Sequence, residues 1–348
     1  MKISILLPYK ENFSPLHPCA ISIFLHGIIA KSKFKNKIIV YGNTKYKKKL
    51  NNNYINLNIK KSFLKSSTKS YLESFVRKEL INRSDLIEIH NRPKYINFLS
   101  KYFNNLILFL HNDPINMEDS KTIAQRINLL NKTRRIIFNS NWTKKRFLEN
   151  LKLTKLQKNK LEVINQSTNK TNVSLDNKEN KIIFVGRLNK SKGYDVFGNS
   201  IVKILDKYKN WFSSVIGDEP REKLIFKHKN LNLLGFKSHK FTLKELSNSS
   251  ICVVCSRWDE PFGRIALEAS SRGCAVIITN KGGLKEAATN PLIVNKLNEK
   301  NLYNAIDRLI SNTNLRKTLQ KKSLKNFYLT NEFISKKVDD SRENIIRS

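Results

Sequence analysis

The sequence predicts an α/β protein with two doubly wound units, each a parallel sheet with helices on both faces. Short apolar runs alternate with longer helical stretches along the chain, which is typical of parallel α/β folds. The alternation stops at a polar stretch rich in Asn, Lys, Ser and Thr and then starts again, as expected for two domains. The length of 348 residues also fits two domains better than one.

The predicted strands follow the apolar runs in order. In the first unit they are residues 3–7, 37–41, 86–89, 106–110, 135–138 and 161–164. In the second unit they are residues 181–185, 213–216, 231–234, 251–254 and 275–278. We therefore expect a first domain at 1–165, a linker at 166–180, a second domain at 181–325 and a helical tail at 326–348 that packs back on the first domain.

The composition excludes several classes of protein. With 40% hydrophobic residues, 11 Gly and 8 Pro, the chain is neither disordered nor collagen-like. No run approaches the ~18 apolar residues of a membrane span, and Pro8 and Lys10 end the first apolar run, so we expect no signal peptide and no membrane anchor. Four unevenly placed cysteines predict reduced thiols in a cytoplasmic protein.

The chain is strongly basic, with 65 Lys and Arg against 28 Asp and Glu and a net charge of +37. Such a charge attracts polyanions, including nucleic acid, acidic glycans and an anionic membrane face. Lysines gather with aromatic residues at 31–37 and 45–49. These clusters fit solvated lysines of a biased composition as well as a membrane-docking face. Without a zinc-finger or RNA-binding signature, we expect no specific nucleic-acid partner.

Ligands of doubly wound sheets bind beyond the carboxyl ends of the strands, so the residues there are the first candidates for a site. After the strand at 181–185, Gly186 allows a tight turn, and the cations Arg187 and Lys192 follow. They could converge on a phosphate pair near the helix that starts around Gly193. Taken alone, this pattern is also typical of a surface turn.

Two further segments have the same order of strand, turn and helix. Glu260 and Glu268 flank a turn at 261–263, where a carboxylate could accept bonds from vicinal sugar hydroxyls while backbone amides hold phosphate. Acidic residues near the start of a helix are, however, common, because the positive end of the helix dipole stabilises a negative charge there. Gly282 and Gly283 form a candidate anion-cradling turn, although most glycine pairs in loops are only turns.

Together, these three segments resemble the nucleotide-sugar half of glycosyltransferase family 4 (group 1 glycosyltransferases). These are retaining enzymes of the GT-B fold, in which two Rossmann-like domains face a central cleft. The resemblance covers residues 185–292 well and the first half more loosely, through 89–93, 110–114 and 138–142. Departures are the absence of glycine from 8–23, where the family often has a glycine-containing loop near the donor phosphates, and a changed turn at 165–168.

The resemblance implies a role for each matching residue. Arg187 and Lys192 would bind the donor diphosphate, and Glu268 the ribose. Glu260, with the amides after it, would hold the transferred sugar and phosphate. The implied donor-binding set is Gly186, Arg187, Lys192, Gly235, Phe236, Glu260, Phe262, Gly263, Arg264 and Glu268.

The first half supplies one implied active-site residue, His111, which matches the family's histidine facing the donor sugar. Read from the residues alone, His111 is also consistent with a structural histidine. The implied catalytic set is His111, Glu260, Arg187 and Lys192. On the acceptor side, the candidates are His90, Arg92 and Asn112.

The predicted function is retaining transfer of a sugar from a nucleoside-diphosphate sugar to a hydroxyl of a glycan or lipid-linked acceptor. We expect a role in cell-envelope polysaccharide or lipopolysaccharide biosynthesis, in the cytoplasm and at the inner face of the membrane. No cofactor is expected, and the absence of an Asp-x-Asp motif predicts metal independence. The alternatives are a sugar-nucleotide epimerase on the same fold and a non-catalytic, basic polyanion-binding protein.

Overall fold

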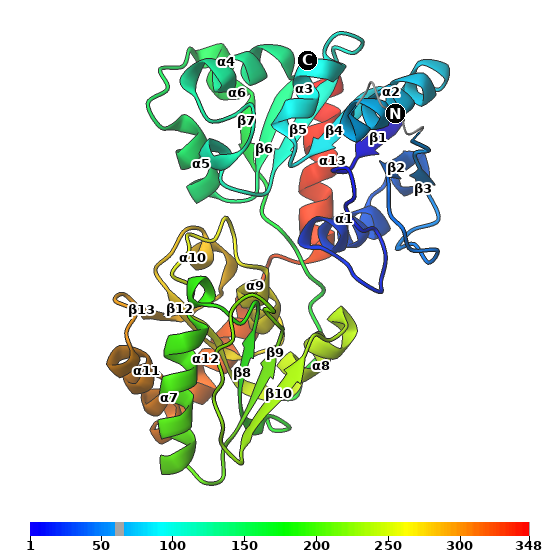
Figure 1. Cartoon of the computed structure of the whole chain (residues 1–348). Helices are drawn as coiled ribbons and strands as arrows, with labels where there is room; N and C mark the ends of the chain where they lie inside the picture. Colours follow the sequence, from blue (N-terminus) through cyan, green and yellow to red (C-terminus); the bar gives the residue numbers. More distant parts are fainter. Residues whose placement is uncertain (60–65, 348) are drawn as a thin grey trace. The chain divides into compact units, whose positions relative to one another are not determined.

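The computed structural model describes residues 1–59 and 66–347. The chain divides into two compact units, one of Met1–Ser167 with Asn331–Ser348 and one of Thr168–Thr330. Each unit has one parallel sheet with helices against it (Figure 1). The predicted α/β fold with two doubly wound units is confirmed.

Among the described residues, the sheet of the first unit has seven parallel strands in the order β3-β2-β1-β4-β5-β6-β7. Its strands are β1 (Ile3–Leu6), β2 (Ile38–Gly42), β3 (Tyr54–Asn56), β4 (Leu86–His90), β5 (Leu106–Leu110), β6 (Arg135–Phe138) and β7 (Leu161–Val163). Its helices are α1 (Ala20–Lys31), α2 (Ser67–Ile81), α3 (Pro93–Leu99), α4 (Ile123–Lys132), α5 (Asn141–Leu148), α6 (Lys155–Asn159) and α13 (Asn331–Arg347), with short 3₁₀ turns η1 (Lys35–Lys37) and η2 (Pro114–Asn116).

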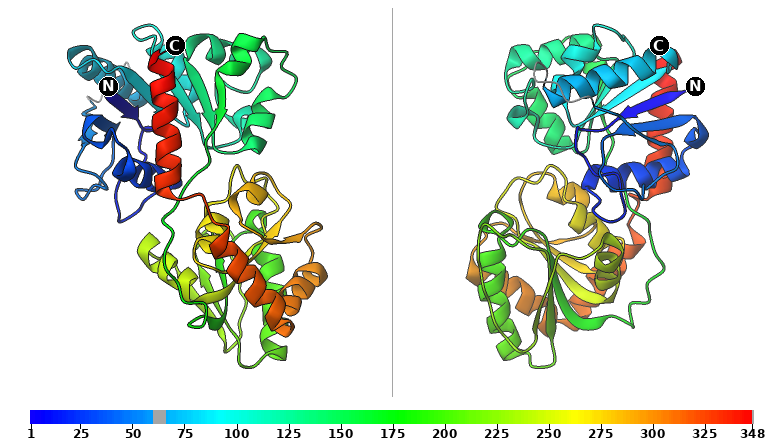
Figure 2. Two further views of the ribbon diagram at one scale, coloured as in Figure 1. Left: turned by 180° about the vertical axis from the view of Figure 1, so that it is seen from behind. Right: turned by 45° about the vertical axis from the view of Figure 1, so that its right-hand side comes forward.

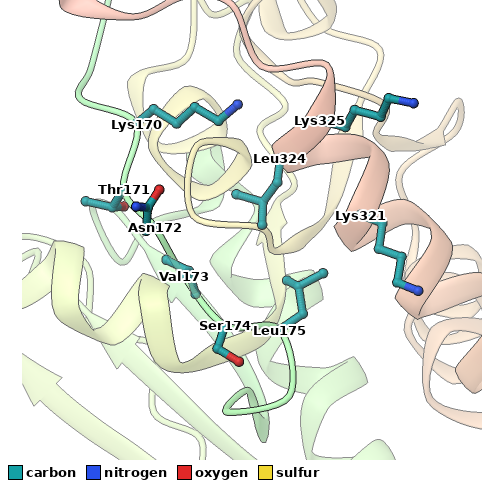
Figure 3. A pocket seen from close by; sticks show the side chains of 9 residues that line it. All are labelled: Lys170, Thr171, Asn172, Val173, Ser174, Leu175, Lys321, Leu324 and Lys325. Atoms are coloured by element: carbon teal, nitrogen blue, oxygen red, sulfur yellow. The ribbon is translucent and has the colours of Figure 1, made fainter.

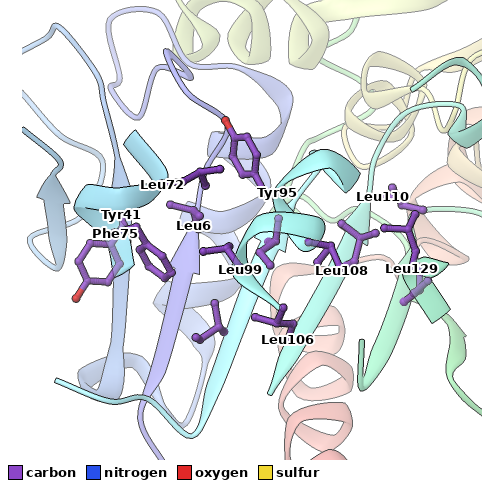
Figure 4. Close-up of a cluster of buried hydrophobic side chains, with 14 of the residues drawn as sticks. Leu6, Tyr41, Leu72, Phe75, Tyr95, Leu99, Leu106, Leu108, Leu110 and Leu129 are labelled. Carbon is purple, nitrogen blue, oxygen red and sulfur yellow. The ribbon is translucent and has the colours of Figure 1, made fainter. Parts of the chain in front are cut away.

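Alternation along β4 sorts its side chains between the two faces of this sheet. Ile87 and Ile89 pack into a core that also contains buried residues of α2, α3 and α4 (Figure 4). Glu88 and His90 point to the opposite face, where Glu88 meets Arg342 of α13. On that face α13 lies beside α1, and Figure 2 shows it in red across the strands. The strand is buried on both faces, and Glu88 and His90 are buried polar residues within it.

The sheet of the second unit has six parallel strands in the order β10-β9-β8-β11-β12-β13. Its strands are β8 (Glu179–Val185), β9 (Phe212–Ile216), β10 (Leu231–Gly235), β11 (Ser249–Val254), β12 (Ala275–Thr279) and β13 (Leu292–Val294). Its helices are η3 (Lys190–Lys192), α7 (Tyr194–Lys207), α8 (His239–Asn248), α9 (Arg264–Ser270), α10 (Leu284–Ala287), α11 (Glu299–Ser311) and α12 (Thr313–Lys325).

The core of the second unit is also built from alternate residues of its strands. Ile182 and Phe184 of β8 are buried in a cluster with residues of α7 and α11. Ile251 and Val253 of β11 join this cluster from the neighbouring strand. At the carboxyl ends of β8 and β11 the strand order reverses, and such a switch point is where doubly wound sheets bind ligands. The corresponding point of the first sheet lies between β1 and β4.

The structure differs from the predicted linker at 166–180. The second unit begins at Thr168, whose amide donates a hydrogen bond to the carbonyl of Leu329 at 3.2 Å. Lys178 packs within this unit and donates to the carbonyl of Ser249 at 2.8 Å. The polar composition of this segment suggested a free linker, but its backbone and one lysine are held by the second unit. The chain returns to the first unit at Asn331, and the helical part of the tail is α13.

The cysteine prediction is consistent with the structure in the part of the chain that it describes. Cys252, Cys255 and Cys274 are buried thiols and Cys19 is partly buried, none of them in a disulfide. Burial raises the pKa of Cys255 to about 12, so its thiol stays protonated. In residues 1–59 and 66–347, none of the helices combines the length and the apolar character of a membrane span.

Candidate functional site

The turn after β8 is shaped by backbone hydrogen bonds and one glycine. The amide of Gly186 donates to the carbonyl of Ile216 at 3.0 Å, and Asn189 caps η3 by accepting from the amide of Lys192 at 3.1 Å. Gly193 has φ of 73°, and a Cβ there would lie 2.0 Å from the carbonyl oxygen of Cys255. Glycine is therefore required at the start of α7, because the chain is left-handed there and touches the end of β11.

Arg187 and Lys192 differ in their surroundings. The Arg187 side chain is exposed, and among the described residues it makes no hydrogen bond or ion pair. Lys192 Nζ forms a hydrogen-bonded ion pair with Glu260 Oε1, with side chains 25% and 14% exposed. Lys192 and Glu260 lie in separate sequence motifs, and the pairing of β8 with β11 brings them together.

The glycine pair of the third motif supports Glu260. The amide of Gly283 donates to the Glu260 carbonyl at 2.6 Å. A Cβ on Gly282 would lie 2.1 Å from the same oxygen, and its φ is 57°. The pair therefore lets one loop backbone approach another and fixes the position of Glu260.

Two more contacts hold the loop that carries Glu260 against η3. The amides of Arg257 and Trp258 donate to the carbonyl of Ser191 at 2.9 and 3.1 Å. The Arg257 guanidinium forms a bidentate pair with Asp195 at 2.6 and 2.8 Å. A bidentate pair adds geometric definition to its charge, so the two loops form one supported surface.

Glu268 lies inside α9 and its side chain is only 1% exposed. Its Oε1 is 2.8 Å from Nε2 of His239 and 2.8 Å from Nε of Arg264. Burial alone would raise the pKa of Glu268, but the positive charge of Arg264 and the bond with His239 outweigh burial and lower it. The carboxylate is therefore ionised, and the predicted ribose contact has to form next to these two partners.

His239 contacts the candidate site residue Glu268 and was not predicted from the sequence. It is the first residue of α8, at the end of the loop that starts with Gly235 and Phe236. Gly235 has φ of 66° at an irregularity of β10, and Phe236 is 55% exposed. A histidine shortly after these two predicted donor-binding residues was the available signal, but only the fold places it against Glu268.

Phe262 and Gly263 complete the turn into α9. The Phe262 side chain is buried, and Gly263 has φ of 114°. A Cβ on Gly263 would lie 2.5 Å from a methyl carbon of Leu284. The Phe262 side chain therefore serves packing, and glycine at 263 lets the turn pass close to Leu284.

In the first unit, the loops after β4 and β5 are joined by Asn91. Its Oδ1 accepts from the amides of His111 and Asn112, both at 3.1 Å, and the Arg92 guanidinium donates to its carbonyl at 2.9 Å. Asn91 has φ of 56°, a conformation that asparagine tolerates better than most residues. Asn112 is exposed.

His90 and His111 are both buried, and His90 Nδ1 lies 3.0 Å from His111 Nε2. Burial lowers the pKa of His111 well below its usual value, and the neighbouring His90 lowers it further. Burial also lowers the pKa of His90, although Glu88 opposes the shift. Both rings are therefore neutral at neutral pH.

In the second unit, Lys192 and Glu260 meet at the switch point between β8 and β11, and Glu268 forms a separate contact with Arg264. Gly235 and Phe236 follow β10, which is two strands away from β8. In the first unit, His90, Arg92, His111 and Asn112 lie at or after the ends of β4 and β5. A hollow of about 570 Å³ between residues 170–175 and α12 contains none of them (Figure 3). Within the described part of the chain, no three His, Cys, Asp or Glu side chains gather as a metal site requires.

Residues 165–326 match the family described as glycosyl transferases group 1. This match lies almost wholly within the second unit and covers a little less than half of the chain. The predicted resemblance is confirmed at this level. An uncharacterized glycosyltransferase of Methanocaldococcus jannaschii is 30% identical over 166 residues, which cover 45% of this chain and 42% of that relative. The chain thus matches less than half the length of this curated relative.

Two solved structures share the fold over nearly the whole chain. HepE of Anabaena, in complex with UDP and glucose, superposes with a TM-score of 0.75 at 14% identity, covering 99% of this chain and all of that one. WaaG, involved in lipopolysaccharide biosynthesis, superposes with a TM-score of 0.66 at 12% identity, covering 97% and 99%. The predicted GT-B fold, with two Rossmann-like α/β domains, is confirmed.

Proposed function

We propose that this protein transfers a sugar from a nucleoside-diphosphate sugar to a hydroxyl group, with retention of configuration. The observation that carries the proposal is the Lys192–Glu260 pair at the switch point of the second sheet, where the exposed Arg187 also follows β8. A cation held at that place neutralises the diphosphate that leaves, and the carboxylate beside it binds sugar hydroxyls. Both functions are needed at one position in the transfer reaction.

In the proposed reaction, the acceptor hydroxyl and the departing phosphate lie on the same face of the sugar. The bond from the anomeric carbon to the phosphate oxygen breaks, the acceptor oxygen bonds to that carbon, and the phosphate takes the hydroxyl proton. Lys192 and Arg187 stabilise the growing phosphate charge. Glu260 and His111 orient the sugar, and Glu260 places a negative charge near the developing positive centre.

We further propose that the reaction needs no metal ion. The support is the sequence, which has no Asp-x-Asp motif, together with two cations after β8 that can take over the charge of a leaving diphosphate. A transfer reaction that proceeds in EDTA at the rate seen with added Mg²⁺ or Mn²⁺ is the expected behaviour.

The donor is tested by thermal unfolding with UDP, GDP, ADP and CMP, each in EDTA. One diphosphate is expected to raise the midpoint, because a ligand at ~100 times its dissociation constant stabilises by about 2.7 kcal/mol. Glu268→Gln keeps the volume of the side chain and removes its charge, and it is expected to abolish most of the shift. Glu299→Gln, on α11 and away from the site, is the matched control and keeps the full shift.

The outcome separates the candidate functions. A shift with one diphosphate supports donor binding, and product analysis with the matching nucleotide sugar then distinguishes transfer from epimerisation. If no nucleotide shifts the midpoint and binding of polyanions falls steeply with salt, the proposal fails in favour of a polyanion-binding protein.

We propose that the acceptor is a glycan or lipid-linked glycan of the cell envelope, such as lipopolysaccharide, reached at the inner face of the membrane. The support is the net charge of +37 and the exposed lysines of the loop after β2. There, Lys45 lies over the ring of Tyr46, and His17 stacks on the same ring with centroids 5.3 Å apart. A basic surface with aromatic rings binds anionic headgroups.

Flotation with vesicles that contain phosphatidylserine tests the membrane surface. Wild type is expected to float at low salt and to be released at high salt. Reversing three lysines weakens binding by about 100-fold or more, since each lysine near an anionic surface contributes about 1 kcal/mol. The variant carries Glu at Lys45, Lys47 and Lys48, and the charge-matched control carries Glu at Lys152, Lys155 and Lys158. Equal loss in both variants would show a general charge effect and no docking surface.

A further inference from the structure

A row of buried polar side chains crosses the first unit on the sheet face that carries α13. Arg342 donates from Nε and Nη2 to the two oxygens of Glu88, at 2.7 and 2.9 Å. Their side chains are 2% and 0% exposed. Arg342 also donates to Asp339 at 2.9 Å. The carboxylate of Glu88 thus lies in the middle of the buried strand β4, and Arg342 of α13 balances its charge.

The row continues to the two histidines. His90 is two residues after Glu88, so both side chains lie on the same face of β4. Its Nε2 is 3.9 Å from Glu88 Oε2, and its ring stacks on Phe109 with centroids 4.4 Å apart. Its Nδ1 is the group that lies 3.0 Å from His111 Nε2.

These contacts select one tautomer of each neutral ring. Glu88 is negatively charged and faces Nε2 of His90, so the proton of His90 belongs on Nε2, where its positive end points at the carboxylate. Nδ1 of His90 then carries a lone pair and can only accept. The hydrogen bond therefore requires a proton on Nε2 of His111, which leaves Nδ1 of His111 as an acceptor. If the proton of His90 were on Nδ1 instead, the lone pair on its Nε2 would face the negative charge of Glu88, and the two would repel each other.

We propose that His90 is a positioning residue that fixes His111 in its Nε2–H tautomer and presents Nδ1 of His111 as an acceptor for a sugar hydroxyl. That nitrogen is buried and has no hydrogen-bond partner among the described residues. An acceptor of this kind matches an O–H donor and places no positive charge beside the reacting carbon. The inference rests on the proposed function, because it takes His111 as the group that faces the sugar.

The test is ¹⁵N NMR of the histidine rings in the full chain, which has six histidines. Protonated and unprotonated ring nitrogens differ strongly in chemical shift, so the spectrum reports each tautomer without any substrate. His90 and His111 are both expected as Nε2–H tautomers, assigned by the loss of signals in His90→Phe and His111→Gln. Finding His111 protonated on Nδ1 would overturn the proposal.

Two variants of His90 distinguish the hydrogen bond that it accepts from the space that its ring fills. His90→Phe keeps a ring against Phe109 and removes the acceptor, so the His111 signals are expected to shift toward a mixture of tautomers and kcat to fall about 10-fold. His90→Asn returns an acceptor oxygen near the place of Nδ1. It is expected to recover most of kcat and most of the wild-type His111 signals. His26→Phe, at an exposed histidine, is the control and changes neither.

The two proposals fail in different ways. If wild type transfers no sugar while both rings have the expected tautomers, the proposed function is wrong and the arrangement of the histidines stands. If transfer occurs and His90→Phe changes neither the His111 signals nor kcat, His90 has no positioning role and the proposed function stands.

Discussion

Lys192→Ala is expected to lower kcat by about 100-fold or more at saturating donor and acceptor. Removing one group that stabilises transition-state charge commonly costs a factor of 10²–10³. Lys192 lies on η3 and is held by Glu260, so its ammonium is in place before substrate binds. Initial rates at several donor concentrations separate kcat from KM and measure the effect.

The neighbouring Lys190 provides the control for this variant. Its side chain is exposed and lies in the same short turn, so Lys190→Ala removes an equal charge with little change in structure. It is expected to retain nearly full activity. An unchanged kcat for Lys192→Ala, with saturation verified, would refute the role of Lys192 as the cation that stabilises the leaving phosphate.

Arg342→Met is expected to lower the free energy of unfolding of the first unit by about 3–5 kcal/mol, the usual cost of breaking a buried ion pair by removing one partner. Glu88 would remain without its bidentate partner in a fully buried position. Urea unfolding followed by circular dichroism measures the loss. Lys336→Met, at an exposed position of the same helix, is the matched control and leaves stability nearly unchanged.

The same pair makes the first unit sensitive to acid. Burial would raise the pKa of Glu88, but Arg342 and His90 lower it to about 2. Because the folded pKa lies below the unfolded value, the stabilisation is complete above the unfolded pKa and is lost as pH falls toward 2.

A double variant tests whether the loss comes from the unpaired charge. Glu88→Leu with Arg342→Met replaces both partners by apolar side chains and is expected to recover most of the stability, since a buried pair is often matched by hydrophobic packing. A double variant as unstable as Arg342→Met alone would instead assign the loss to the packing of α13.

The strands that the sequence missed show where periodicity fails. β3 (Tyr54–Asn56) and β13 (Leu292–Val294) have three residues each and lie at sheet edges. Such short segments become strands through hydrogen bonds to one neighbour, and their own residues carry no sustained apolar pattern. The central strands are buried on both faces and were visible as apolar runs.

The residues of the candidate site also divide into those that could be predicted from the sequence and those that could not. Gly186, Arg187 and Lys192 could be chosen from the sequence because a strand end, a glycine and two cations are close neighbours there. His239 and Glu88 could not, because their partners Glu268 and Arg342 are far away along the chain. The available signal for Glu88 was a carboxylate inside the apolar run of β4.

The two α/β units and the residues that follow each strand can be predicted from the sequence, because strand burial and turn chemistry are local properties that repeat along the chain. Which of these residues contact one another depends on the tertiary structure. Strand order places Lys192 against Glu260, and the return of α13 places Arg342 on Glu88 behind the two histidines. Contacts of this kind depend on sheet topology, which brings distant segments side by side and leaves no mark in the local sequence.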